Sequence, residues 1–381
     1  MPDKKEDITF NRPTMVGREL DHVRSAVEQM HISGDGGYTR RCAELLRDEL
    51  GVAGALLTTS CTAALEMSAL LLDAEPGDEV IVPSYTFVSS VSAFALRGFK
   101  PVFADIRRDT LNLDEAGLPG LITDRTRAIV LVHYSGVGCE MEAIGRLAAD
   151  RGIEIIEDNA HGLFARYRGK PLGTFGRWST LSFHETKNLT CGEGGALLLN
   201  RSEDVARAEV LRDKGTNRQQ LFRGEVDKYT WVDQGSSYAL SDLLAAYLWA
   251  QFEERESIAR RRAAIWNAYD GAFRGTLERH GAQLPAVFDG CEQSHHMYWM
   301  LLPDLGTRTR FIEHMKKDGI LCVSHYQPLH ASAMGRKLAA REFDCPVSVE
   351  VAERLVRLPF YNDLSPDDRD RVIEGTLRFF S

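Results

Sequence analysis

The sequence predicts an α/β protein built on a mostly parallel sheet of about seven strands. Short apolar runs alternate with segments of helical spacing over the first 200 residues. The runs are apolar throughout, which indicates strands buried on both faces, as in a parallel sheet covered by helices. Strands are expected at residues 53–59, 79–83, 100–104, 128–134, 153–158, 179–184 and 195–200.

Helices are expected before, between and after these strands. At 17–31, Leu20, Val23, Val27 and Met30 recur at helical spacing and predict one apolar face. Further helices are predicted at 39–50, 62–73 and 140–152, one long helix at about 240–270, and strand-like pieces at 297–304 and 319–328. We therefore expect a fold type with two parts, a large domain at 1–254 and a smaller C-terminal α/β domain at 255–381.

Composition narrows the class of protein. The 381 residues carry a net charge of −9, which favours neither nucleic acid nor an anionic membrane as a partner. The seven cysteines are scattered and include no CxxC pair, which indicates reduced thiols in a cytoplasmic protein. We expect no signal peptide and no membrane span, because no apolar run approaches the roughly 18 residues that a span needs.

Ligands of a parallel sheet bind at the carboxyl ends of its strands, so the residues that follow each apolar run are the candidates. Cys61 and Thr62 open the helix after the first strand. Free backbone N–H groups and hydroxyls there form an anion site, unless Ser60 or Thr62 is a plain N-cap. Phe87, after the second strand, is placed either to stack on a planar ring or to fill the core.

A carboxylate and a lysine follow two further strands. Asp158 ends the strand at 153–158, where burial requires a partner: a cationic ring nitrogen, an arginine, or the N–H groups of the next turn. Lys187 follows the strand at 179–184 and precedes a glycine-rich turn. It is either a solvated loop lysine or a desolvated amine that forms a Schiff base. The four features, in this chain order on one sheet, predict a pocket for pyridoxal 5′-phosphate (PLP).

The segments TSCTAALE, PGDEVIVPSYTFVSS, EDNAHG, SFHETKN and GEGGALL resemble those of the DegT-type sugar-nucleotide aminotransferases, a branch of the fold type I PLP enzymes. The resemblance runs from FNRPTMVGREL to RLPFYNDLS. It implies the fold type I architecture. It also implies a role for each matching residue: Lys187 binds PLP covalently and shuttles the proton, Asp158 keeps the pyridine nitrogen protonated, Phe87 stacks on the ring, Cys61, Thr62 and Ser182 bind the phosphate, and His161 lies beside the ring near its 3′ oxygen.

The same resemblance implies partners. Family members are homodimers with shared active sites, and Ser237 stands where a family asparagine reaches the other subunit's phosphate. Arg218, Arg223 and Lys228 are candidates for the sugar-nucleotide diphosphate, or else belong to a solvated charged loop. Tyr326 and His330 lie in an SHYQPLH segment that the family places near the active site. No metal is expected, because His295 and His296 have no further ligand in register.

The resemblance implies transfer of an amino group from L-glutamate to C4 of dTDP-4-keto-6-deoxy-D-glucose, which gives a dTDP-4-amino-4,6-dideoxyhexose. Alternatives are a C3 sugar-nucleotide transaminase and a PLP-dependent sugar dehydratase. A remote alternative is a non-catalytic sugar-nucleotide sensor. Some relatives have histidine in place of the lysine, so the presence of Lys187 favours transamination.

Overall fold

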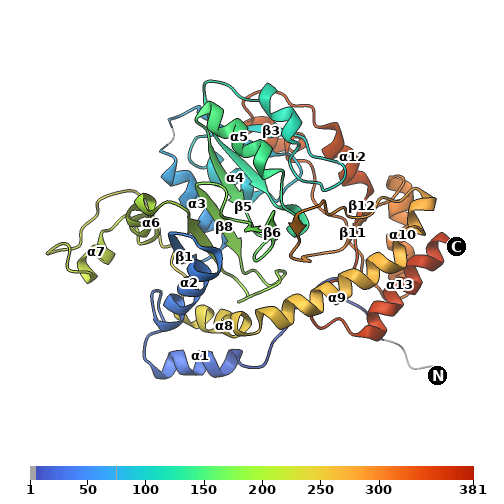
Figure 1. The fold of residues 1–381 in the computed structure, drawn as a ribbon, viewed down its shortest axis with the longest axis horizontal. Coiled ribbons are helices and arrows are strands. Elements are labelled where there is room, and N and C mark those ends of the chain that lie inside the picture. Colours follow the sequence, from blue (N-terminus) through green and yellow to red (C-terminus); the bar gives the residue numbers. More distant parts are fainter. Residues whose placement is uncertain (1–5, 74) are drawn as a thin grey trace.

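A central seven-stranded sheet organises the protein (Figure 1), whose computed structural model describes residues 6–73 and 75–381. Its strands are β1 (Gly54–Thr58), β2 (Glu79–Pro83), β3 (Lys100–Ala104), β4 (Thr126–Val132), β5 (Glu154–Asp158), β8 (Trp178–Ser182) and β9 (Gly195–Leu199). The order is β1-β9-β8-β5-β4-β2-β3, and only β9 runs antiparallel to its neighbours. The predicted α/β class and the seven predicted strands are confirmed.

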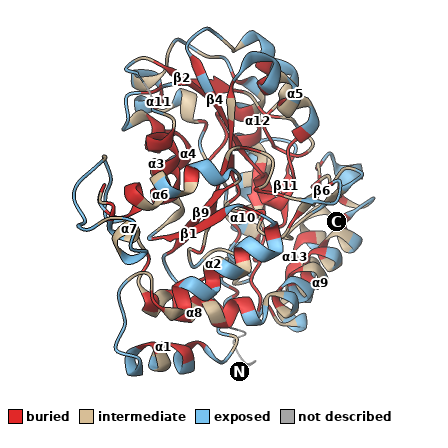
Figure 2. Cartoon of the chain, turned by 60° about the vertical axis from the view of Figure 1, so that its left-hand side comes forward, coloured by how far each residue is buried: buried red, intermediate tan, exposed pale blue. Residues whose placement is uncertain are grey.

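Helices cover both faces of the sheet. One face packs against α3 (Cys61–Leu71), α4 (Ser89–Ala95) and α6 (Val205–Arg212). The other packs against α2 (Gly37–Leu50), α8 (Asp242–Glu253) and α5 (Met141–Arg151). The strands are buried between helices whose outer sides are exposed (Figure 2), which explains why their sequences are apolar without alternation.

The C-terminal part of the chain forms a second apolar cluster. It is built from α9 (Arg255–Phe273), α10 (Leu305–Lys317), α13 (Pro366–Phe380) and the antiparallel pair β11 (Trp299–Leu301) and β12 (Leu355–Arg357). The remaining elements include α1 (Glu19–Glu28), α7 (Arg218–Phe222), α11 (Ala333–Leu338), α12 (Pro346–Arg354), β6 (Arg166–Tyr167), β7 (Lys170–Pro171) and β10 (Cys291–Glu292). None of the described helices has the length and apolarity needed to cross a membrane.

Two predictions about the C-terminal part were wrong. The single helix expected at 240–270 is two helices, because the chain leaves helical geometry at Glu254 (φ −102°, ψ 12°). The segment at 319–328 contributes isolated bridges through Ile320 and Val323 and no strand of its own. Residues 253–257 are all polar and contain neither glycine nor proline, so no local breaker residue marks the division into two helices.

Of the four residues predicted to form the apolar face of the first helix, only Val23 packs against the core. Leu20, Val27 and Met30 are 62%, 54% and 92% exposed, whereas Glu19 and His22 are buried. The Glu19 carboxylate accepts hydrogen bonds from backbone N–H groups before the helix and from a side chain of α8. His22 bonds to side chains of α2 and α8. This polar network lies on the inner side of α1 together with Val23 and Ala26, and it leaves Leu20 and Val27 exposed.

Candidate active site

A cavity of about 590 Å³ lies at the carboxyl ends of the central strands. Its floor comes from residues that follow β2, β4, β5 and β8, and its opposite wall from the C-terminal part, including Met297 and Tyr326. The structure brings eight predicted site residues together in its lining: Cys61, Thr62, Phe87, Asp158, His161, Ser182, Lys187 and Tyr326. The location agrees with the rule that parallel sheets bind ligands beyond their carboxyl ends.

Lys187 is held in the turn that follows β8, where its backbone N–H donates to the carbonyl of His184 at 2.9 Å. Burial lowers the pKa of its amine from 10.5 to about 8; the charge of Arg357 adds to this, while Cys61 and Asp158 oppose it. A substantial fraction of the amine is therefore neutral near physiological pH and is able to attack a carbonyl carbon. Lys187 is not the solvated loop lysine of the alternative interpretation.

Asp158 ends β5 and is 5% exposed. The Ser90 hydroxyl donates to its Oδ2 at 2.6 Å, and the Ala160 N–H donates to its Oδ1 at 3.2 Å. Burial raises the pKa of Asp158, whereas the Ser90 hydrogen bond and the charge of Lys187 lower it. The carboxylate thus caps the following turn with one oxygen and still faces the cavity, where it is suited to a cationic ring nitrogen.

The start of α3 opens into the cavity. Ser60 is the N-cap and accepts a hydrogen bond from the Ala63 N–H at 3.1 Å, while the Thr62 and Ser89 hydroxyls lie 2.8 Å apart. A Cβ on Gly195 would lie 2.4 Å from the carbonyl carbon of Ser60, so only glycine lets β9 approach the helix start. Burial raises the pKa of Cys61, which keeps its thiol neutral at a site suited to an anion.

Two neutral histidines form another wall. The rings of His161 and His296 stack with centroids 4.2 Å apart at an interplanar angle of 17°. The Ser135 N–H donates to Nδ1 of His161 at 3.3 Å, which places the ring proton on Nε2. Burial lowers the pKa of both imidazoles. His296 also bonds through Nδ1 to the Asn188 side chain at 2.8 Å.

An aromatic cluster closes the cavity from the C-terminal side. Tyr326 stacks on His325 at 3.5 Å, and Nδ1 of His325 lies 2.6 Å from the hydroxyl of Tyr134. Tyr326 has a backbone φ of 37°, a strained value for a residue with a side chain. Phe87 lies 6.3 Å from Tyr326 between ring centroids and is 56% exposed, so it lines the cavity rather than filling the core.

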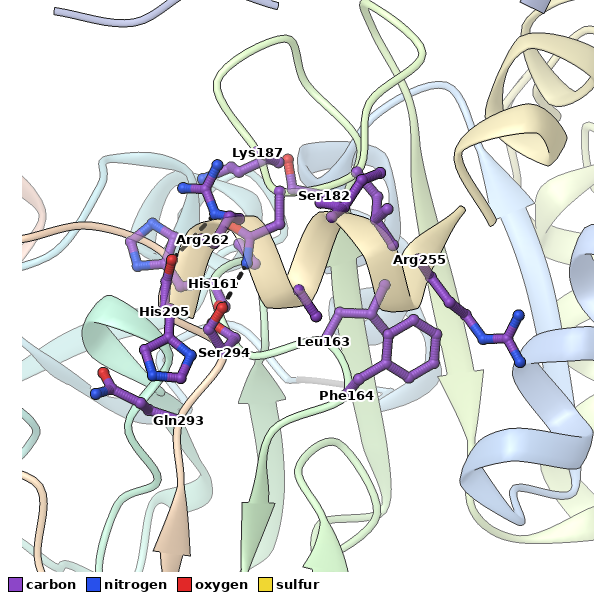
Figure 3. Close-up of a pocket in the computed structure, with 15 residues that line it drawn as sticks. His161, Leu163, Phe164, Ser182, Lys187, Arg255, Arg262, Gln293, Ser294 and His295 are labelled. Carbon is purple, nitrogen blue, oxygen red and sulfur yellow. Dashed lines mark hydrogen bonds between the residues drawn. The ribbon is translucent and has the colours of Figure 1, made fainter. Parts of the chain in front are cut away.

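A smaller cavity of about 100 Å³ adjoins the first and shares Lys187 and His161 with it (Figure 3). Arg262 projects into this region from α9. It donates to the carbonyl oxygens of His295, at 3.0 Å, and of His296, and to Oδ1 of Asn362 at 2.7 Å. Burial lowers the pKa of Arg262 to about 9. Because its donors are used in this way, Arg262 fixes the backbone that carries the stacked His296.

Five predicted residues lie outside the cavity lining of this chain. His330 bonds to Ser84 at 2.6 Å instead of facing the cavity. Arg223 pairs with carboxylates of its own loop and of α6, and α7 with its loops projects from the body (Figure 1). The five are Ser237, Arg218, Arg223, Lys228 and His330.

Sequence reasoning assigned no cofactor-site role to Ser90, His296 or Arg357, whereas His325 lies in the SHYQPLH segment expected near the active site. Ser90 lies on α4, three residues beyond the predicted Phe87, and only the fold turns it toward Asp158. His296 was considered as a metal ligand; in the described part of the chain no group of three or more such side chains is gathered. Arg357 lies in the RLPF segment, 170 residues beyond Lys187, and no motif links the two.

Comparison with known proteins identifies the family. Residues 13–376 match the DegT/DnrJ/EryC1/StrS aminotransferase family, and the chain belongs to that family. The chain is 33% identical to the uncharacterized protein MJ1066 of Methanocaldococcus jannaschii, over 97% of each of the two chains. It is 28% identical to the GDP-perosamine synthase of Escherichia coli O157:H7, over 98% of this chain and 99% of the synthase. The structure resembles that of the protein Spr1654 from Streptococcus pneumoniae, which is solved in a PLP form and in a pyridoxamine 5′-phosphate (PMP) form. For the PMP form the TM-score is 0.90 at 27% identity, covering 98% and 99% of the chains. The predicted family and the fold type I architecture are confirmed.

Proposed function

We propose that the protein is a PLP-dependent aminotransferase that acts on a nucleotide-linked keto-deoxysugar. The observation that carries this proposal is the pairing, in one cavity, of the Lys187 amine with a pKa of about 8 and the buried Asp158 carboxylate. The family match and the PLP and PMP forms of Spr1654 support the choice of cofactor. The GDP-perosamine synthase supports a sugar nucleotide as substrate.

The residues present fit PLP. The start of α3 with Cys61 and Thr62, together with Ser182, would hold the phosphate. Asp158 would hold the protonated ring nitrogen, and the Nε2–H of His161 is free to donate to a ring oxygen. PLP would supply an electron sink when the donor loses its α-proton. Lys187 would anchor the cofactor, and its amine, once displaced, would take the proton from the α-carbon of the donor and deliver it to the cofactor.

At the finer level we propose that L-glutamate donates the amino group and that C4 of dTDP-4-keto-6-deoxy-D-glucose receives it. The segments SGDGGYTRRC, KGTNRQQLFRGEVDKYTW and GSSY support this, because they resemble those of dTDP-4-amino-4,6-dideoxygalactose transaminase. Arg218, Arg223 and Lys228 remain candidates for the diphosphate. A C3 transaminase and a sugar dehydratase are the competing reactions.

We propose further that two copies form a cytoplasmic homodimer with shared active sites, and that each copy comprises a large domain at 1–254 and a small domain at 255–381. The exposed Leu20 and Val27 of α1 support the dimer, as do Phe222 and Trp231 on the projecting loop, which are 65% and 78% exposed. The same loop carries the diphosphate candidates, so a second copy is a means of bringing them to a cavity.

The proposal is tested by the visible absorption of the PLP-loaded protein. We expect L-glutamate to abolish the band of the enzyme-bound cofactor and dTDP-4-keto-6-deoxyglucose to restore it; proton NMR of the product then reports the amination site and its configuration. Lys187→Ala is the matched control and should show neither change. If the wild-type protein forms no such band, the anchoring role of Lys187 is wrong and the sensor alternative gains support.

A further inference from the structure

Arg357 is a cation of the cavity lining that forms no ion pair with any of the described residues. Arg357 ends β12 and lines the cavity together with Lys187, His325 and Tyr326. Its Nε is buried and has no hydrogen-bond partner among the described residues. Burial lowers the pKa of Arg357, and the influences that oppose burial come from the hydroxyls of nearby tyrosines rather than from a carboxylate. A buried charge without a partner is costly and indicates that a ligand supplies the partner.

The arginine is held rigidly in this position. Its backbone pairs with Trp299 in β11 on one side and exchanges two hydrogen bonds with Val323 on the other, at 2.8 and 3.2 Å. Its guanidinium lies over the ring of Phe10, with Cζ 4.4 Å from the ring centroid. Stacking of this kind orients the planar group while leaving its edge free for a planar anion.

Arg262 provides the contrast within the same region. Each of its three side-chain nitrogens donates to a carbonyl or amide oxygen, so three of its five N–H groups are bound within the protein. Among the described residues, the guanidinium of Arg357 has no hydrogen-bond partner of this kind. The difference indicates that Arg262 is structural, whereas Arg357 is reserved for a ligand.

We propose that Arg357 binds the α-carboxylate of the amino donor, and this inference rests on the proposed function. An α-amino acid carries its amine and its carboxylate on the same carbon. When the amine of the donor takes the place of the Lys187 amine at the cofactor, the α-carboxylate of the donor must therefore lie deep in the cavity. The keto-sugar presents its charge differently, because its diphosphate is attached across the ring from C4. The cofactor phosphate has its own site at the start of α3.

The charge of Arg357 reaches the residues that would surround such a carboxylate. It lowers the pKa of Lys187, His161 and His325, which places the guanidinium within electrostatic range of all three. Because burial keeps the two imidazoles neutral, they do not compete for the anion. A planar carboxylate matches the fork of the guanidinium with two parallel hydrogen bonds.

The test compares the PLP-loaded wild-type protein with Arg357→Met and the conservative Arg357→Lys. Calorimetry measures the binding of glutarate, which has carboxylates but no amine. Rapid-mixing spectroscopy compares L-glutamate with its α-amide. We expect Arg357→Met to weaken the binding of glutarate and of L-glutamate by roughly 100-fold. Its binding of the α-amide should change little. The variant should therefore lose the wild-type preference for a free α-carboxylate over an amide. Arg357→Lys should retain part of that preference, because it keeps the charge and loses the fork.

Arg341→Met is the matched control. This exposed arginine also lies over an aromatic ring, Phe343, at 5.0 Å, but is not part of the cavity lining. It should leave glutarate binding unchanged. The inference is overturned if Arg357→Met binds glutarate as the wild type does, if the α-amide is weakened equally, or if only the keto-sugar reaction slows. A wild type that reacts with amino acids but not with keto-sugars would overturn the proposed function and leave the role of Arg357 intact.

Discussion

Replacing Lys187 with methionine is expected to stabilise the apoprotein at pH 7. The pKa of Lys187 falls from 10.5 to about 8 on folding, chiefly through burial. At about 1.4 kcal/mol for each tenfold change, holding the charged amine in the folded protein costs about 3 kcal/mol. Methionine is uncharged and similar in length, so Lys187→Met removes that cost.

The pH dependence of this effect has a definite sign. Because the pKa is lower in the folded state, the unfolded chain binds more protons between about pH 8 and 10.5. The stability of the wild type therefore rises with pH in that window, while the contribution of residue 187 to the variant is constant. The difference in the free energy of unfolding between Lys187→Met and the wild type should therefore shrink by about 3 kcal/mol between pH 7 and pH 10.5.

Urea denaturation of both apoproteins at the two pH values measures this difference, with hydrogen exchange in β8 as a second probe. Lys100→Met, which removes an exposed lysine at the start of β3, is the control and should change the free energy of unfolding by no more than about 0.5 kcal/mol. A stability difference between Lys187→Met and the wild type that is the same at both pH values would refute the reasoning. It would mean that the Lys187 amine is solvated in the folded protein.

Two further substitutions test the geometry around the cavity. Gly195→Ala places a Cβ against the backbone at the start of α3, and it should lower the free energy of unfolding by about 1–3 kcal/mol and weaken PLP binding. Denaturation and cofactor titration measure these two effects. The control Gly145→Ala, in open space on α5, should instead raise the free energy of unfolding by about 0.5–1 kcal/mol. Ser90→Ala removes the 2.6 Å hydrogen bond to Asp158 and should raise the pKa of that carboxyl, which moves the acid limb of the kcat/KM profile to higher pH. Ser68→Ala, a buried serine bonded only within α3, should leave that profile unchanged.

The sheet and much of the site could be predicted from the sequence because both depend on local patterns. Strands buried on both faces are apolar throughout, and the residues that follow them must lie at one edge of a parallel sheet. Lys187, Asp158 and the start of α3 were therefore expected to lie close together, and they do. Each of these residues follows or ends a strand, so its position in the sequence is enough to predict its place at the edge of the sheet.

The rest depends on contacts that leave no local pattern. The apolar side of α1 indicates burial but does not say against what, and the polar network of Glu19 and His22 turns it away from the chain's own core. Arg357 opens the RLPFYNDLS segment that takes part in the family resemblance, but the segment alone assigns it no role. Only the packing of β12 against β11 brings it to the cavity.

The electrostatics of the cavity explain how a chain with a net charge of −9 accommodates anionic ligands. The cavity holds Lys187 and Arg357 against the single buried carboxylate of Asp158. Burial lowers the pKa of His161, His296 and His325 and so keeps these three imidazoles neutral. Attraction of an anion is thus confined to the interior, where a charge–charge interaction is stronger than at the surface. Lys187 follows a strand of the central sheet and Arg357 ends a strand of the C-terminal part. The anion site therefore exists only when the C-terminal part is packed on the sheet, and loosening that packing should weaken the binding of carboxylates before it disturbs the cofactor site at α3.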